Sequence, residues 1–279
     1  MSIVTFWSNG KEETGKTLSI AAIATYISIQ HNYKVLIVST GHKDQTLSNC
    51  FWKDQKVKKN FGLFGPNTNI ETEDGVSGLV RAMKSKRLTA DSIKNYTKPV
   101  LKDRLEILQG FKGNESEYEE VRSTYVDIVT LANNYYDLVF IDLDKELGKE
   151  ISDAILTASN VIVANINQRL SSINKFIELR EEKTILKSQK CLILVGKYDK
   201  HSKYTAKNIS RYLNEKNKVS VIPYNTLFFE ACEEAGVIDL FFTFEKIKDN
   251  DDKNFLFLTE VKRVSDNIIY RIQDLSIRM

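Results

Sequence analysis

The segment Gly10–Thr17 carries the strongest chemical signal in the chain, because its residues GKEETGKT match the pattern GxxxxGK(S/T). It directly follows an apolar run and precedes a helical one, which is the context that a phosphate-binding loop requires. In such a loop Lys16 supplies a charge to the β- and γ-phosphates, and the Thr17 hydroxyl ligates Mg²⁺. The alternative is a glycine-containing turn between a strand and a helix. The expected nucleotide contacts are Gly10, Lys11, Glu12, Glu13, Thr14, Gly15, Lys16 and Thr17.

A loop of this kind needs a carboxylate at the end of a neighbouring strand to complete the Mg²⁺ site. Asp142 closes the fully apolar run Leu138–Ile141 and is placed for that role. Asp144 lies two residues later and is a second candidate. For both residues the alternative is capping of the next helix. We therefore predict Thr17 and Asp142 as the metal ligands, with a nucleotide and Mg²⁺ as the cofactors.

Short apolar runs alternate with longer runs in which apolar residues recur three and four apart. The strand-like runs are Ile3–Trp7, Lys34–Ser39, Arg104–Leu108, Asp137–Asp142, Asn160–Ile166, Lys190–Val195 and Val219–Ile222. The helical runs are Thr17–Gln30, Val76–Lys84, Tyr118–Asn133, Glu146–Thr157, Leu170–Glu182 and Thr205–Asn214. This alternation indicates a mainly parallel sheet covered on both faces. We expect a three-layer α/β fold of the P-loop NTPase type, as a single domain over residues 1–279.

The composition is that of an ordinary globular protein, with 42% hydrophobic and 28% charged residues, and excludes a disordered or collagen-like chain. The 40 basic and 37 acidic side chains nearly balance, so bulk charge neither requires nor excludes nucleic acid as a partner. The three cysteines and three histidines form no CxxC or HExxH motif. Their scatter argues against a disulfide framework or a thiolate- or histidine-held metal, and it predicts a cytoplasmic location.

The loop and its surroundings resemble the ParA/MinD group of P-loop ATPases, whose loop has an additional lysine in the pattern KGGxGK(S/T). Lys11 and Lys16 have that spacing. The helix Thr17–Gln30 and the following run Tyr33–Val38 resemble the first helix and second strand of the family. Weaker echoes are Leu105–Gly110, Tyr136–Asp142, Ile222–Asn225 and the helical stretch Phe228–Gly236.

The resemblance implies a cytosolic ATPase that dimerises face to face around two ATP molecules. Lys11 would be a catalytic residue that reaches the nucleotide of the partner subunit, although an exposed loop lysine is the plain alternative. Pro223 would lie among the nucleotide contacts. Proteins of this group position DNA, division machinery, flagella or pili, while some relatives carry out metabolic chemistry.

Several residues depart from the family pattern. Glu12 and Glu13 replace two loop glycines, and carboxylates beside a triphosphate repel it unless they point outward or bind the metal. Ser39 and Gly41 stand where the second strand of the family usually has two acidic residues, so Asp44 is the remaining candidate for the catalytic acid. Gly196, followed by Lys197, occupies the position of an asparagine that commonly contacts adenine.

These departures affect residues that the family uses for hydrolysis more than residues that it uses to bind the nucleotide. We expect ATP binding with weak or absent hydrolysis, in a dimerisation switch that positions a cargo. Atypical loops of this kind occur in the TadZ/CpaE branch, which places pilus-assembly systems, but that branch usually carries an N-terminal receiver-like domain and this chain starts at the ATPase strand. The alternatives are a pseudo-ATPase scaffold without a nucleotide cycle and a metabolic P-loop enzyme acting on a small molecule.

The expected partners are a second copy of the chain and a protein cargo or adaptor. Nonspecific DNA is a further candidate, through basic side chains that are more often a solvated face: Lys53, Lys56, Lys58, Lys59, Lys84, Lys86 and Arg87. Apolar residues recur at helical spacing near the C-terminus, at Val261, Val264, Ile268, Ile272 and Leu275. A membrane surface would suit such a helix, but packing on the sheet explains the stripe more simply.

Overall fold

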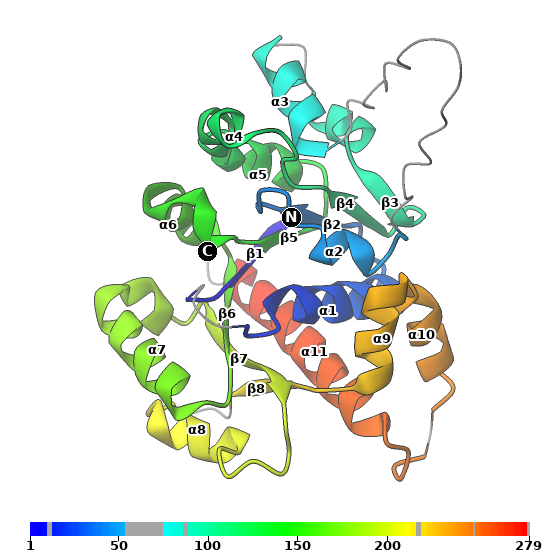
Figure 1. Cartoon of the computed structure of the whole chain (residues 1–279), viewed down its shortest axis with the longest axis vertical. Helices are drawn as coiled ribbons and strands as arrows, with labels where there is room; N and C mark the ends of the chain where they lie inside the picture. Colours follow the sequence, from blue (N-terminus) through cyan, green and yellow to red (C-terminus); the bar gives the residue numbers. More distant parts are fainter. Residues whose placement is uncertain (10–12, 54–74, 86–88, 216–218, 248, 278–279) are drawn as a thin grey trace, which may run out of the picture.

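The computed structural model describes residues 1–9, 13–53, 75–85, 89–215, 219–247 and 249–277, and it contains an eight-stranded sheet (Figure 1). The strands lie in the order β3-β4-β2-β5-β1-β6-β7-β8. Their bounds are β1 (Ser2–Trp7), β2 (Val35–Ser39), β3 (Lys98–Leu101), β4 (Leu105–Leu108), β5 (Leu138–Asp142), β6 (Val161–Ile166), β7 (Cys191–Tyr198) and β8 (Ser220–Pro223). All neighbours pair in parallel except β3, which runs antiparallel to β4 at one edge. The predicted α/β fold with a mainly parallel sheet is confirmed.

Helices cover both faces of the sheet (Figure 1). One face is covered by α1 (Lys16–Gln30), α2 (Thr46–Asn49), α9 (Thr226–Glu234), α10 (Val237–Phe244) and α11 (Phe255–Ile277). The other is covered by α3 (Gly75–Lys84), α4 (Glu115–Arg122), α5 (Tyr125–Asn133), α6 (Lys149–Ala158), α7 (Leu170–Glu182) and α8 (Ala206–Tyr212). Successive side chains of β1 alternate between the two resulting cores: Val4 and Phe6 face the first, Ile3 and Trp7 the second. Three short 3₁₀ helices complete the described elements: η1 (Ala90–Asn95), η2 (Lys145–Leu147) and η3 (Thr184–Lys187).

The strand order reverses at β1, and this point decides where a ligand can bind. β1 pairs with β5 on one side and with β6 on the other. The chain leaves β1 through α1 towards β2, whereas it leaves β5 through α6 to reach β6 on the opposite side of β1. In open α/β sheets, ligands bind in the crevice at the carboxyl ends of the strands where the order reverses. The segment that follows β1 lies at this position.

Some predicted elements differ from the structure. The expected helix Tyr118–Asn133 is wrong as a single element, because it consists of α4 and α5 with a break at Ser123 and Thr124. The Thr124 hydroxyl donates to the carbonyl of Val121 at 2.6 Å, so it competes for a helix acceptor. The chain also contains α2, β3 and α10, which the sequence pattern did not predict. The basic stretch after Lys53 lies outside the described residues.

The C-terminal helix α11 packs on the sheet. Its residues Val261, Val264 and Ile268 are fully buried in the same core as α1. For these three residues, packing on the sheet explains the apolar stripe. Among the helices of the described residues, none has the length and apolar character needed to cross a bilayer.

Candidate functional site

The predicted phosphate loop lies between β1 and α1, at the carboxyl end of the central strand. Gly10, Lys11 and Glu12 lie outside the described residues, so their predicted roles have no structural account. Gly15 precedes α1 with φ 71° and ψ 22°, the left-handed conformation that glycine adopts without steric cost. Among the described residues no side chain caps α1, and its first turn contains no acidic residue. The N–H groups and the positive end of the helix dipole therefore suit an anion.

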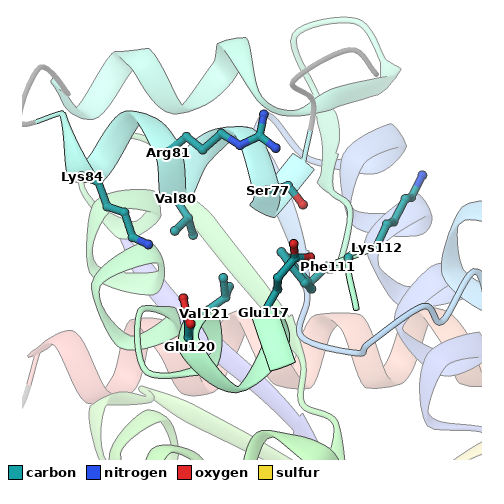
Figure 2. A pocket seen from close by; sticks show the side chains of 10 residues that line it. Ser77, Val80, Arg81, Lys84, Phe111, Lys112, Glu117, Glu120 and Val121 are labelled. Carbon is teal, nitrogen blue, oxygen red and sulfur yellow. The ribbon is translucent and has the colours of Figure 1, made fainter. Parts of the chain in front are cut away.

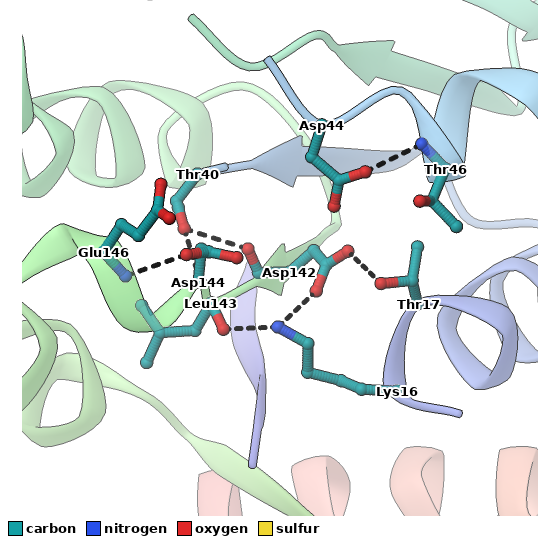
Figure 3. A network of polar contacts seen from close by, with 9 residues as sticks. All are labelled: Lys16, Thr17, Thr40, Asp44, Thr46, Asp142, Leu143, Asp144 and Glu146. Atoms are coloured by element: carbon teal, nitrogen blue, oxygen red, sulfur yellow. Dashed lines mark hydrogen bonds and ion pairs between the residues drawn. The ribbon is translucent and has the colours of Figure 1, made fainter. Parts of the chain in front are cut away.

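Lys16 and Thr17 both reach the carboxylate of Asp142 at the end of β5 (Figure 3). The Lys16 ammonium lies 2.7 Å from Asp142 Oδ1 and also donates to the carbonyl of Leu143. The Thr17 hydroxyl donates to Asp142 Oδ2 at 2.9 Å. The register explains the approach, because Asp142 pairs with Phe6 on β1, just before the loop. One cation, one hydroxyl and one carboxylate thus meet beside the start of α1.

Asp144 has a different environment from Asp142. Its Oδ1 accepts from the backbone N–H of Glu146 at 2.8 Å, so it caps the short helix η2 (Figure 3). Its own N–H donates to the Thr40 hydroxyl at 2.8 Å, and that hydroxyl donates to the carbonyl of Asp142 at 3.0 Å. The geometry favours the capping interpretation for Asp144. Thr40 joins the ends of β2 and β5, a role that no sequence motif indicates.

Asp44 lies on the segment after β2 and faces the same edge of the sheet as Asp142 and Thr17 (Figure 3). The side chain is exposed, and its Oδ1 accepts from the backbone N–H of Thr46 at 2.9 Å. The segment is held to β5 because the N–H of Thr40 donates to the carbonyl of Asp142 at 3.2 Å. Gly41 belongs to the same segment, and a Cβ on Gly110 would lie 2.3 Å from its carbonyl oxygen. A Cβ on Gly41 itself would lie 3.0 Å from Asp44 Cβ, so the backbone at Gly41 packs closely against Asp44 and against Gly110.

The end of β7 makes the closest contact with the loop. A Cβ on Gly196 would lie 2.1 Å from the carbonyl oxygen of Thr14, so only glycine fits there. The next residue, Lys197, forms an ion pair with Glu13 at 2.9 Å. The hydrogen bond and charge of Lys197 lower the pKa of the Glu13 carboxyl. The negative charge of Glu13 therefore has a partner on β7, a strand that is distant in the sequence.

Pro223 lies beside the loop at the end of β8. Together with Tyr224 and Lys197 it lines a small cavity of about 20 Å³ next to Gly15. The same three residues also border a larger cavity of about 900 Å³ between the end of β7 and the first half of α11. Pro223 therefore lies close to the loop, and its place among the nucleotide contacts stays a prediction.

A third cavity of about 480 Å³ lies between α3 and α4 (Figure 2). Val80, Phe111 and Val121 are nearly buried in its floor, and Lys84 and Glu120 lie at its rim. It contains none of the predicted nucleotide-binding residues. Elsewhere, the described residues contain no group of three or more His, Cys, Asp or Glu side chains that would hold a metal ion.

Similarity to solved structures extends over almost the whole chain. A ParA family ATPase from Chlorobium tepidum TLS is 15% identical with a TM-score of 0.67, covering 94% of this chain and 98% of that one. The septum site-determining protein MinD from Pyrococcus horikoshii OT3, complexed with Mg-ADP, is 15% identical with a TM-score of 0.62, covering 97% and 98%. A McdA variant from Cyanothece in complex with ATP is 12% identical with a TM-score of 0.63, covering 95% of each chain.

No protein-family model matches the sequence, and no curated protein matches it. The structural similarities show the fold: an eight-stranded, mostly parallel sheet surrounded by helices, as in ParA/MinD P-loop NTPases.

Proposed function

We propose that this protein is an ATP-binding dimerisation switch that positions a cellular cargo and hydrolyses ATP slowly or not at all. The observation that carries the proposal is the convergence of Lys16 and Thr17 on Asp142 at the carboxyl end of the sheet. Positioning ATPases of the same fold support the choice of ligand, since the MinD and McdA structures hold Mg-ADP and ATP.

The residues at the loop fit a nucleotide and a divalent cation. Lys16 would exchange Asp142 for phosphate oxygens, and the N–H groups at the start of α1 would add further donors. Thr17 and Asp142 offer the hydroxyl and carboxylate oxygens that Mg²⁺ prefers. Pro223 would border the base. Bound Mg-ATP supplies the negative charge and the phosphate chain that these groups are arranged to receive.

We expect slow hydrolysis because two positions at this edge of the sheet lack a carboxylate that could orient a water molecule. Ser39 and Gly41 bring no carboxylate to this edge, and Asp44 is the acid on the segment after β2 that would orient a water molecule. We expect Asp44→Asn to abolish residual phosphate release while leaving ATP affinity within about threefold of wild type, because Asp44 does not contact Lys16 or Thr17. A coupled phosphate-release assay measures this. Equal turnover in both proteins would remove Asp44 from the mechanism.

Dimerisation is tested by light-scattering mass with and without Mg²⁺-ATP, using the wild type and Lys16→Ala. We expect the wild type to change from monomer to dimer with ATP and the variant to remain monomeric, because the phosphates lose their main charge partner. The same titrations give nucleotide affinity, which Lys16→Ala should lower at least about 100-fold. A wild-type protein that binds no nucleotide would favour the scaffold alternative.

The cargo and its place in the cell belong to the same proposal. We place the protein in the cytoplasm as a homodimer that recruits a protein cargo or adaptor, with a pilus-assembly system as one specific case. Nonspecific DNA is the alternative binding partner of such a switch. Salt-dependent retention of the ATP-bound protein on DNA tests this alternative.

A further inference from the structure

Lys197 occupies an unusual position at the end of β7. The pairing of β7 with β8 shifts register between Val195 and Tyr198, so Gly196 and Lys197 bulge out of the regular ladder. Bulges redirect side chains and are common next to active sites. Lys197 also has a φ of 50°, a left-handed conformation that is uncommon for a residue with a side chain. The backbone therefore adopts an unfavourable conformation at the point where this lysine leaves the strand.

The side chain of Lys197 crosses the phosphate loop. A Cβ on Gly15 would lie 3.1 Å from Lys197 Cγ and 3.5 Å from its backbone nitrogen. Beyond Gly15 the ammonium reaches Glu13 at 2.9 Å. Lys197 thus passes the residue directly before Lys16, at the start of α1, where phosphate oxygens are expected.

The sheet places Lys197 and Asp142 on opposite sides of the loop. Asp142 ends β5, which pairs with β1 on one side. Lys197 lies on β7, which is separated from β1 by β6 on the other side. Lys197 also lines the small cavity with Pro223 and Tyr224. Lys16 and Thr17 reach Asp142, whereas Lys197 lies between Gly15 and the small cavity that Pro223 and Tyr224 line.

The ion pair that holds Lys197 is weak and easily exchanged. The Glu13 side chain is 89% exposed and that of Lys197 is 36% exposed, so water screens their attraction. A phosphate chain at the start of α1 brings several negative charges into a less exposed place, where charge-assisted hydrogen bonds are stronger. The ammonium is therefore expected to leave Glu13 when phosphates are present.

We propose that Lys197 is a further phosphate-binding lysine of this site, which exchanges Glu13 for the base-side α- and β-phosphates when a nucleotide binds. The inference rests on the proposed function, because it takes a nucleotide as the ligand. It assigns Glu13 a role as well: the carboxylate holds Lys197 beside the loop and competes with the nucleotide for this lysine.

Calorimetric titrations of the full chain with Mg-ADP and Mg-ATP test the proposal. Lys197→Met keeps the length of the side chain and removes its charge, and Lys197→Arg keeps the charge. Lys207→Met, on the exposed face of α8, is the matched control because it changes the net charge equally. We expect Lys197→Met to weaken both nucleotides about tenfold or more. Lys197→Arg should bind more tightly than Lys197→Met, and the control should match the wild type.

Glu13→Gln gives a second and independent readout. Glu13→Gln should increase the affinity for both nucleotides severalfold when Lys197 is present. In combination with Lys197→Met it should have no effect, because the ammonium for which Glu13 and the nucleotide compete is then absent. Equal tightening in both backgrounds would show that Glu13 repels the nucleotide directly and would overturn the exchange.

Affinities for Lys197→Met within twofold of wild type, or a loss for ATP alone, would also overturn the assignment to the α- and β-phosphates. A wild-type chain that binds neither nucleotide would instead refute the proposed function. Thermal unfolding without nucleotide identifies any variant whose weak binding comes from misfolding.

Discussion

The close approach of β7 to the phosphate loop makes Gly196→Ala a sharp test of the site. The added Cβ would lie 2.1 Å from the carbonyl oxygen of Thr14 and 3.2 Å from its carbonyl carbon. Because nonbonded heavy atoms are most stable about 3.5–4.0 Å apart, the loop or the strand must move by roughly 1 Å or more. Thr14 immediately precedes Gly15, so this movement displaces the start of α1.

Two effects are expected from Gly196→Ala. Overpacking of this kind costs about 1–3 kcal/mol of unfolding free energy. Loss of one hydrogen bond to a charged phosphate costs about 1.5–3 kcal/mol, which lowers nucleotide affinity about 10- to 100-fold. Urea unfolding followed by circular dichroism measures the first effect, and calorimetric titration with Mg-ATP measures the second.

Gly236→Ala is the matched control for this substitution. Gly236 precedes α10 with φ −106°, and a Cβ there would meet its nearest neighbours in Ala231 at 3.9 Å. We expect unchanged affinity and a stability within about 0.5 kcal/mol of wild type or slightly above it. If Gly196→Ala also behaves like the wild type in both assays, β7 does not contact the loop as described and the reasoning fails.

Three further predictions concern the buried parts of the fold. Burial raises the pKa of Tyr136, whose hydroxyl donates to Glu106 Oε2 at 2.6 Å, so Tyr136→Phe should cost about 1–3 kcal/mol in urea unfolding; an unchanged midpoint would contradict this bond. Ile268→Ala in α11 should cost about 2–5 kcal/mol, whereas Tyr270→Ala on the exposed side should stay within about 0.5 kcal/mol; similar values would show that α11 is not packed. Burial raises the pKa of the Cys191 thiol to about 12 from 9.0, so at pH 9 iodoacetamide should modify it slowly in the folded chain and rapidly in urea, as mass spectrometry of the Cys191 peptide shows; fast native modification of this peptide would contradict the raised pKa.

Local sequence patterns were sufficient for most of the fold. The apolar runs were long and regular enough to place seven of the eight strands, because a strand buried on both faces has no polar side. β3 was not predicted, since Lys98 and Pro99 are exposed at an edge where burial imposes no pattern. The break between α4 and α5 was missed for a similar reason: the apolar period continues through it, while the hydroxyl of Thr124 decides the local backbone.

In the candidate site, too, the sequence placed some residues and only the structure placed the others. Lys16 and Thr17 belong to one motif, and Asp142 could be placed beside them because the carboxyl ends of parallel strands share one edge of a sheet. Their roles in binding nucleotide and metal remain predictions. The capping role of Asp144 was an alternative from the outset, and hydrogen-bond geometry favours it. The position of Asp44 towards the same edge follows from the segment after β2, whose path the residue pattern does not specify.

The sequence by itself determined the kind of sheet, the place of the loop between the first strand and the first helix, and the residue types available for phosphate and metal. Only the tertiary structure decided how residues far apart in the chain meet. Glu13 and Lys197 are 184 positions apart, and their ion pair depends on the strand order, the bulge in β7 and the space left by Gly196. Local sequence encodes hydrophobic period and loop chemistry over a few residues, whereas such a contact depends on how every intervening element packs.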